Sequence, residues 1–394
     1  LTQMGRNGET PKHVKNETTE EFDWRTPPTN PLELRKWKEK KKALKRKWKE
    51  EKLLKKLEKQ KQLEAEEETK KRRIEEEEKQ KLAVGRQYTV SIALPGSILD
   101  NAQTPELRSY LAGQIARAAV VFNVDEIVIF DEGGGSSKTT EGDYKGVGKK
   151  GNANVQMARI LQYLECPQYL RKAFFPQHKD LQYAGLLNPL DCPHHTKVDS
   201  DLLYREGVVL KKPVKEGKGS YVDIGLQKHV QIDKILQDGV RVTVKLNSLT
   251  SEGRNLKGHV VAPSAPRTDG GLYWGYTVRL AGSLSAVFTE CPHPDGYDLL
   301  IGTSEKGTTV DEFDMPPFSR LLVVFGGVQG LESCLDADPD LKLEDPSLLF
   351  QHYLNTCPGQ GSHTIRTEEA LLITLGALRP KIASANHKEV TNHR

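Results

Sequence analysis

Three polar segments near the end of the chain carry the residues best suited to hold a small ligand. They are "IGTSE" from Ile301, "FGGVQG" from Phe325 and "NTCPGQGSHTI" from Asn355, and each follows a run of residues typical of a strand. Glycine after a buried strand lets backbone approach a ligand closely, and parallel sheets bind ligands at the carboxyl ends of their strands. The three segments together therefore predict one shared pocket, although a single glycine-rich turn would predict nothing.

The composition of these segments does not favour a nucleoside triphosphate. "FGGVQG" departs from the G-x-G-x-x-G pattern, and "GVGKKG" (residues 146–151) has no Ser or Thr after its lysine, as a P-loop requires. A ligand held through backbone amides and carbonyls fits better. The sequence "CPHH" (Cys192–His195) could bind a metal, but no second ligand pair follows at zinc spacing. We expect a surface turn there and no metal site.

The segments need a sheet to bring them together, and the first half of that sheet can be predicted from residue periodicity. Alternation over Tyr88–Leu94 and the short apolar run Glu126–Phe130 predict two strands. A helix starting at Pro105 and another over Asn154–Glu165 follow them in turn. The order strand, helix, strand, helix predicts an α/β domain with a parallel sheet. Thr367 can cap a last helix, and Pro380 is expected to limit it.

Between residues 199 and 290 the helical periodicity disappears. About six short strand-like runs alternate with glycine turns, which predicts a small β-barrel. The stretch "GSYVDIGLQKHVQID…GVRVTVKL" resembles OB-type barrels that bind single-stranded RNA. Cationic and aromatic side chains that could serve such binding are Lys228, Arg241, Lys245, Tyr221 and Tyr276. The alternative is a barrel with ordinary surface lysines.

The expected organisation places this barrel inside a discontinuous domain. We expect a disordered tail over 1–33, a helix rich in lysine and glutamate over 34–83, an α/β domain formed by 84–198 and 291–380, the inserted barrel over 199–290, and a disordered tail over 381–394. Because the sequence begins with Leu1, we expect the natural start to lie upstream.

The charge of the chain is concentrated in the predicted charged helix. From Arg35 to Lys59 there are fourteen Lys or Arg and four Asp or Glu, whereas the whole chain has a net charge of +4. Such a segment, with Trp37 and Trp48, could contact phosphates and stack on bases or serve in nuclear import, or it could be a solvated helix. Five dispersed cysteines favour reduced thiols in a cytosolic or nuclear protein, and no membrane span is expected.

Three stretches in fixed order give the chain a resemblance to a known family. "GSILDNAQTPELRSYLAGQIARAAVVFNVDEIVIF", "FGGVQG" and "NTCPGQGSHTIRTEEALL" are similar to the SPOUT-class RNA methyltransferases. The resemblance implies an α/β domain with a deep trefoil knot, S-adenosylmethionine bound within the knot, and a homodimer with sites at the subunit interface.

The resemblance also implies roles for individual residues. Asn101 and Arg117 would face the target nucleotide as the catalytic pair. The cofactor would be bound by three groups of residues: Thr303, Ser304, Glu305 and Lys306; Gly326, Gly327 and Gly330; and Asn355, Thr356, Pro358, Gly359, Gln360, Gly361, Thr364 and Ile365. Lys306 stands where we expect an arginine in close relatives, which would keep the charge but lose a bidentate fork.

We therefore expect an S-adenosylmethionine-dependent RNA methyltransferase that modifies a uridine base in structured, ribosomal RNA. The resemblance further implies a nuclear or nucleolar location, with spindle and centromere association in mitosis; a cytoplasmic location stays open. The alternative is a nuclear RNA-binding or spindle-associated scaffold with a vestigial cofactor pocket. Methylation of protein is a third possibility, which the basic helix and the barrel serve poorly.

Overall fold

The structure, a computed structural model, describes residues 85–132, 149–215, 217–249 and 255–392, and part of the segment from 27 to 55. Of residues 149–152 and 387–392 it describes the backbone alone. The chain divides into two units, Leu1–Gln80 and Lys81–Arg394. In the first unit the described residues from 31 to 55 are helical, so the helix begins slightly before the predicted residue 34. The rest of the predicted helix, and most of the tail predicted over 1–33, lie outside the described residues.

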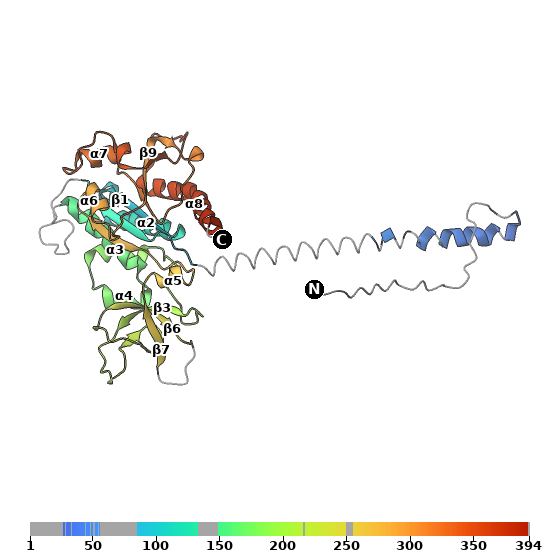
Figure 1. The fold of residues 1–394 in the computed structure, drawn as a ribbon, viewed down its shortest axis with the longest axis horizontal. Helices are drawn as coiled ribbons and strands as arrows, with labels where there is room; N and C mark the ends of the chain where they lie inside the picture. The colour runs from blue at the N-terminus through green and yellow to red at the C-terminus, as the bar shows by residue number, and fades with distance from the viewer. Residues whose placement is uncertain are drawn as a thin grey trace, which may run out of the picture. The chain divides into compact units, whose positions relative to one another are not determined.

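The second unit contains a six-stranded sheet with the order β11-β9-β10-β1-β2-β8. Figure 1 labels two of its strands, β1 and β9. Every pairing in the sheet is parallel, as the alternation of strands and helices predicted. The strands are β1 (Thr89–Pro95), β2 (Glu126–Phe130), β8 (Thr277–Ala281), β9 (Leu299–Thr309), β10 (Arg320–Val324) and β11 (His352–Asn355). Because the strands are parallel, their carboxyl ends meet at one edge, where the predicted ligand-binding segments lie.

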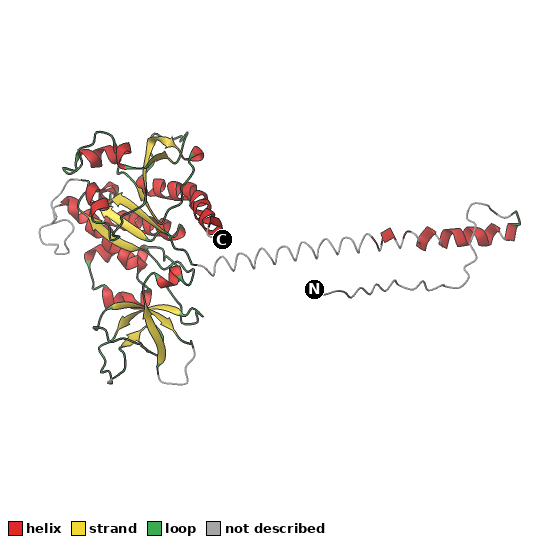
Figure 2. Cartoon of the chain, in the orientation of Figure 1, coloured by secondary structure: helices red, strands yellow, loops and turns green. Residues whose placement is uncertain are grey.

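Helices cover both faces of this sheet (Figure 2). Side chains of β1 alternate between two cores: Val90, Ile92 and Leu94 join one core cluster, and Ala93 joins the other. The first cluster includes the inner faces of α2 (Pro105–Val121), α3 (Lys149–Glu165) and α8 (Thr367–Asn392). The second includes α6 (Leu284–Thr289) and α7 (Gly330–Asp336). The sheet is therefore buried on both sides, which explains the continuous apolar runs of its strands.

Short helices complete the unit. They are α4 (Gln168–Phe174), α5 (Ala265–Thr268) and the 3-10 turns η1 (Gly96–Asn101), η3 (Lys179–Leu181), η4 (Ala184–Leu186), η5 (Val310–Glu312) and η6 (Pro346–Leu349). Among the described residues, no helix has the length and apolar character that a membrane crossing needs.

An inserted barrel forms the other half of the unit, but it is smaller than expected. Its five strands close in the order β3-β4-β5-β7-β6. They are β3 (Tyr204–Val209), β4 (Tyr221–Asp223), β5 (Val230–Gln231), β6 (Arg241–Leu246) and β7 (Leu256–Val261). The sixth predicted strand is β8, which pairs with β2 in the large sheet. The barrel therefore ends before β8 and not at residue 290.

The structure also corrects the prediction of a disordered tail over 381–394. Helix α8 continues through Pro380 to Asn392, so the proline does not end it. Proline removes one backbone hydrogen bond from a helix, but packing can compensate for that loss. Here Ala385 is 1% exposed in the first core cluster, and Ile382 packs against the same cluster.

Candidate functional site

The three ligand-like segments enclose one cavity of about 400 Å³ at the carboxyl edge of the sheet. Twelve of the fifteen residues predicted to bind a cofactor line it: Thr303, Ser304, Glu305, Lys306, Gly326, Gly327, Gly330, Asn355, Thr356, Gln360, Thr364 and Ile365. The remaining three, Pro358, Gly359 and Gly361, belong to the same third segment but not to the cavity wall. The prediction that these segments converge is confirmed.

The second segment joins β10 to α7 by a tight turn. Gly327 and Gly330 form an isolated antiparallel bridge, and Gly330 has φ +77°, a conformation that favours glycine. A Cβ on Gly326 would lie 2.6 Å from the carbonyl carbon of Gly330, so a side chain there would displace backbone. Glycine is therefore required for the shape of this wall.

The first segment differs from the simple strand-to-loop transition that was expected. Residues 303–307 lie within β9, where the pairing with β11 jumps from Tyr353 opposite Gly302 to Leu354 opposite Thr308. The intervening residues thus bulge out of the ladder and into the cavity wall. Thr303 fixes the bulge by donating its hydroxyl to the carbonyl of Val324, at 3.0 Å.

The third segment connects β11 to α8 and is fixed at both ends. The Asn355 side-chain amide donates to the carbonyl of Glu305 at 3.0 Å, which holds the third segment against the first. The Thr367 hydroxyl donates to the carbonyl of Gly326 at 3.1 Å, which holds the start of α8 against the second. All three segments are thus cross-linked by side-chain hydrogen bonds.

One ion pair spans the cavity. The Nζ of Lys306 lies 2.7 Å from Oε1 of Glu332, at the start of α7. Partial burial acts to raise the pKa of the Glu332 carboxyl, but the hydrogen bond from Lys306 outweighs it and lowers that pKa. Sequence reasoning missed Glu332, although its position in the first turn of the helix after "FGGVQG" was a usable signal.

The predicted catalytic residues do not line this cavity within the chain. Asn101 is exposed at the end of η1. Arg117, on α2, donates from Nη1 to the carbonyl of Leu190 at 2.6 Å. In this chain Arg117 therefore tethers the segment that follows η4, and its catalytic role stays a prediction.

The residues predicted to bind RNA are dispersed. Lys228 and Lys245 are exposed on the barrel, and Tyr221 is half-buried. Tyr276 is only 5% exposed, donates its hydroxyl to the carbonyl of Leu161 and precedes β8, so it cannot stack on a base. The prediction for Tyr276 is wrong because its side chain lies in the first core cluster and not on the surface of the barrel.

Arg241 also forms its hydrogen bonds within the protein and not toward a ligand. Its guanidinium makes two bonds to Glu165 (2.7 and 2.9 Å) and one to Glu206 (2.8 Å), which joins the barrel to the end of α3. Burial would raise the pKa of the Glu165 carboxyl, but hydrogen bonds from His194 and Arg241 outweigh burial and lower it to about 2. A larger cavity of about 940 Å³ lies beside this network, and the ionised groups in its wall are paired with each other.

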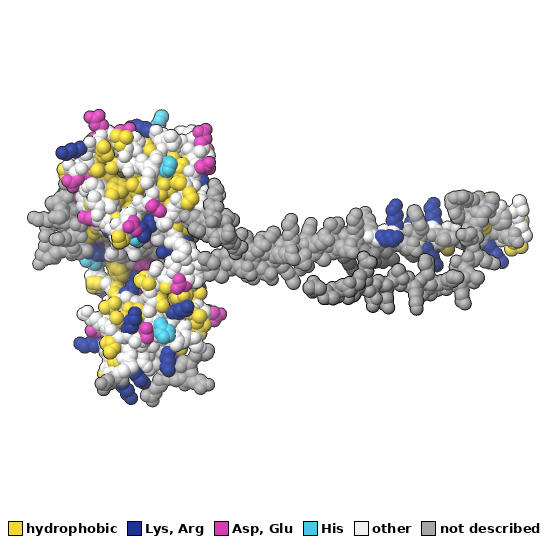
Figure 3. Space-filling model, in the orientation of Figure 1, with side chains coloured by type: hydrophobic (Ala, Val, Ile, Leu, Met, Phe, Trp, Pro, Cys, Tyr) yellow, Lys and Arg dark blue, Asp and Glu magenta, His cyan; other side chains and the backbone are white. Residues whose placement is uncertain are grey.

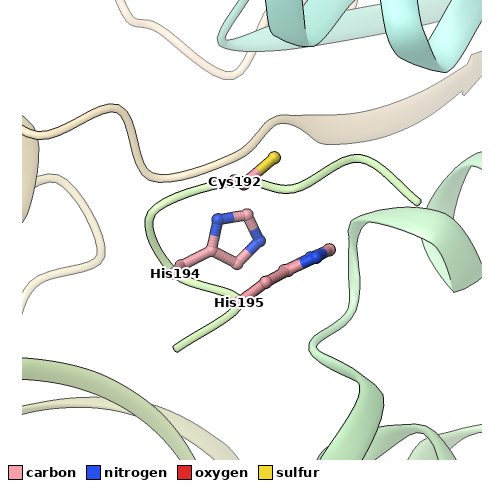
Figure 4. Close-up of side chains that lie close together, drawn as sticks. All are labelled: Cys192, His194 and His195. Carbon is pink, nitrogen blue, oxygen red and sulfur yellow. The ribbon is translucent and has the colours of Figure 1, made fainter. Parts of the chain in front are cut away.

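Cys192, His194 and His195 lie close together in the interior, where a surface turn was expected (Figure 4). Their possible ligand atoms are within 4.8 Å of one another. However, Nε2 of His194 and Nε2 of His195 lie 2.8 and 2.7 Å from one carbonyl oxygen, that of Glu165. Burial lowers the pKa of His195 to about 4, so its ring is neutral at pH 7. The two rings thus cap the carboxyl end of α3.

Comparisons with known proteins agree with the geometry. A family model described as "Putative RNA methyltransferase" matches residues 89–378. The chain is 63% identical to the human "28S rRNA (uridine-N(3))-methyltransferase", over 76% of this chain and 80% of that protein. It is 38% identical to "Putative methyltransferase spot-1" of Caenorhabditis elegans, over 76% of this chain and 82% of that protein.

Among solved structures, the chain was matched to the SpoU methyltransferase AviRb from Streptomyces viridochromogenes in complex with the cofactor AdoMet. The two share 10% sequence identity with a TM-score of 0.29, over 76% of this chain and 60% of that chain. The family match spans most of the chain and all three segments of the cavity. On that ground, the chain belongs to this family of RNA methyltransferases.

Proposed function

We propose that this protein transfers the methyl group of S-adenosylmethionine to N3 of a uridine in 28S ribosomal RNA. The human, mouse and fruit-fly relatives, at 63%, 62% and 53% identity, all have names that state this reaction. The observation in the structure that carries the proposal is the convergence of the three segments on one cavity.

The cavity suits the cofactor in size and in chemistry. Its volume of about 400 Å³ lies within the range of roughly 300–1,000 Å³ that is usual for small-molecule sites. Ile365 and Ile373 offer apolar contact for a purine ring, and Asn355 and Gln360 offer amide groups. S-adenosylmethionine supplies an electrophilic methyl group when bound. The trefoil knot that the resemblance implies stays a prediction.

The protein must contribute two things to the reaction. It must align the acceptor nitrogen with the methyl carbon, because positioning supplies much of the acceleration in such displacements. It must also take up the proton of N3–H, since a protonated uracil nitrogen has no lone pair free to attack. The first task falls to the cavity and the surfaces that dock RNA.

A direct test measures 3-methyluridine in unmodified 28S rRNA after incubation with the protein and S-adenosylmethionine, by nucleoside mass spectrometry. We expect 3-methyluridine with the natural protein and none with Gly327→Arg, because Gly327 lines the cavity and a long side chain there would take up the space that the cofactor needs. The matched control is Gly185→Arg, at an exposed glycine with nothing within 4 Å of its Cβ position. Cofactor binding measured by calorimetry should be lost in the first variant alone. Absence of 3-methyluridine with the natural protein would overturn the proposal.

We further propose a homodimer in which Asn101 and Arg117 of one subunit face the cavity of the other. Support comes from large apolar side chains that are exposed on α2 and α8, namely Leu107, Tyr110, Val121 and Leu372. Apolar patches on a surface mark interaction sites, and a subunit interface across α2 and α8 would cover these side chains. Light scattering of the purified protein tests the dimer, and a monomer at micromolar concentration would contradict it.

The barrel and the charged helix are proposed to dock the RNA. On the face shown in Figure 3, Lys and Arg side chains are dispersed over the barrel half, among hydrophobic side chains that are visible on both halves. In the charged helix, Lys41 lies over the ring of Trp37 at 4.3 Å. Salt titration of RNA binding, with and without residues 1–80, tests the contribution of the helix.

The location of the protein is also a proposal. The lysine-rich segment supports import into the nucleus, where we place the protein, including the nucleolus, with spindle and centromere association in mitosis. Imaging of the tagged protein through the cell cycle tests both statements. The scaffold alternative is not favoured, because the close relatives are named as methyltransferases. Cofactor binding without methyl transfer to any RNA would revive it.

A further inference from the structure

Glu132 follows the buried strand β2 at the same edge of the sheet as the cavity. Strand β1 separates β2 from β10, so the carboxyl ends of β2 and β10 lie on either side of the end of β1. Ligands in such sheets bind outside the carboxyl ends of the strands. Glu132 is therefore placed where a second reactant would approach the cofactor.

Its carboxylate is held by contacts from three separate elements. The hydroxyl of Ser97, just after β1, donates to Oε2 of Glu132, and the thiol of Cys334 on α7 lies 3.4 Å from Oε1. On the third side lies Gly327, where an added Cβ would be 2.1 Å from Oε1 of Glu132. The carboxylate thus contacts the same glycine that lines the cofactor cavity.

The methyl acceptor has to approach the cofactor from outside the cavity. Gly327 belongs to the cavity wall, whereas Glu132 does not. When the cofactor fills the cavity, the methyl acceptor has to enter from outside its wall. A carboxylate that contacts the wall residue can therefore meet the acceptor without competing with the cofactor for space.

The partners of Glu132 leave it able to accept a proton. Both known donors to it, a hydroxyl and a thiol, are neutral, and no salt bridge to it is found in the described parts of the chain. By contrast, Glu332 is paired with Lys306, and the side chain of Glu305 is exposed. A carboxylate without a cationic partner retains its lone pairs for a substrate N–H.

We propose that Glu132 is the general base that takes the N3 proton of the target uridine. The proposal rests on the proposed function. The N3–H bond breaks and its proton passes to a Glu132 oxygen, while the electron pair of N3 attacks the methyl carbon. The bond between that carbon and sulfur breaks, and its electron pair stays on sulfur, which leaves S-adenosylhomocysteine, 3-methyluridine and a protonated Glu132.

The experiment compares Glu132→Gln with the natural protein on 28S rRNA containing uridine or 5-fluorouridine. Glutamine keeps the shape and can still accept from Ser97, but it cannot take a proton. We expect kcat on uridine RNA to fall on the order of 100-fold, within the usual contribution of a general base. Because N3–H of 5-fluorouridine is more acidic, the loss on 5-fluorouridine RNA should be at least tenfold smaller. The loss should also shrink as pH rises and the substrate ionises unaided.

Two measurements separate this role from a merely structural one. Calorimetry with S-adenosylmethionine should give the same affinity for Glu132→Gln and the natural protein, within about a factor of two. Glu312→Gln, at an exposed residue of η5 outside the cavity, serves as the charge-matched control and should keep full activity. Unchanged kcat in Glu132→Gln, or an equal loss on both RNAs at every pH, would overturn the role of Glu132. Absence of 3-methyluridine with the natural protein would instead overturn the proposed function.

Discussion

At the scale of single residues, Arg241 shows how a group that suits RNA binding can be used for another purpose. Its side chain is 32% exposed, but its guanidinium bonds to Glu165 and Glu206, whose side chains are 10% and 4% exposed. Glu206 also accepts from Thr243 and from the indole of Trp274, both at 2.6 Å. Arg241 is therefore the cation that two buried carboxylates require.

We expect Arg241→Met to destabilise the protein by about 3 kcal/mol, because it leaves two buried carboxylates without their cation. Lys245→Met, at an exposed position on the same strand, should change the free energy of unfolding by less than about 0.5 kcal/mol. Chemical denaturation of both variants measures the difference. If Arg241→Met instead weakened RNA binding at unchanged stability, its predicted role in RNA docking would be restored.

Residue type and spacing alone could predict only some of the site residues. The glycines and amides of the three segments could be identified because three such segments follow strands of one sheet, whereas a single glycine-rich turn would predict nothing. Arg241 and Tyr276 could not be distinguished from surface residues. Their residue types alone do not show that Arg241 bonds to Glu165 and that Tyr276 donates to the carbonyl of Leu161. Glu132 was missed although it lies two residues after the buried strand β2, at the edge where the cavity was expected.

At the scale of elements, α8 and β8 show where local rules give way to packing. Period-two alternation over Thr277–Ala281 fits a barrel strand and an edge strand equally well, so only tertiary pairing decides between them. Similarly, Pro380 predicts a helix end, but α8 continues because the following turn has an apolar contact to make. The parallel sheet itself was predictable, since alternating strands and helices leave few other arrangements.

We expect Ala385→Asp to destabilise the protein by about 3 kcal/mol, because it places a charge in the core that α8 completes. The matched control is Ser384→Asp, one residue earlier on the exposed side of the same turn. That variant should remain within about 0.5 kcal/mol of the natural protein. Thermal unfolding of the two variants gives the comparison. Equal stability would mean that the helix beyond Pro380 does not pack, and that the expected disordered tail is correct.

At the scale of the whole molecule, the cavity and the proposed catalytic pair are separate within one chain. The cavity lies at the carboxyl edge of the sheet, whereas Arg117 lies on α2 and is bonded to the carbonyl of Leu190. A closed twofold dimer uses the same surface of both subunits, so it creates two equivalent composite sites. In such a dimer each subunit would supply the cofactor cavity of one site and the Arg117 side chain of the other.

This arrangement predicts complementation between two inactive proteins. Gly327→Arg should lose cofactor binding, and Arg117→Ala should keep cofactor binding but lose activity. After the two are unfolded together and refolded at equal amounts, half of the dimers would be mixed, and each mixed dimer would contain one intact site and one doubly damaged site. Methyl transfer to 28S rRNA should therefore return to about a quarter of the natural level. If Arg117 acted in its own subunit, no mixed dimer would contain a complete site, and the mixture would stay inactive.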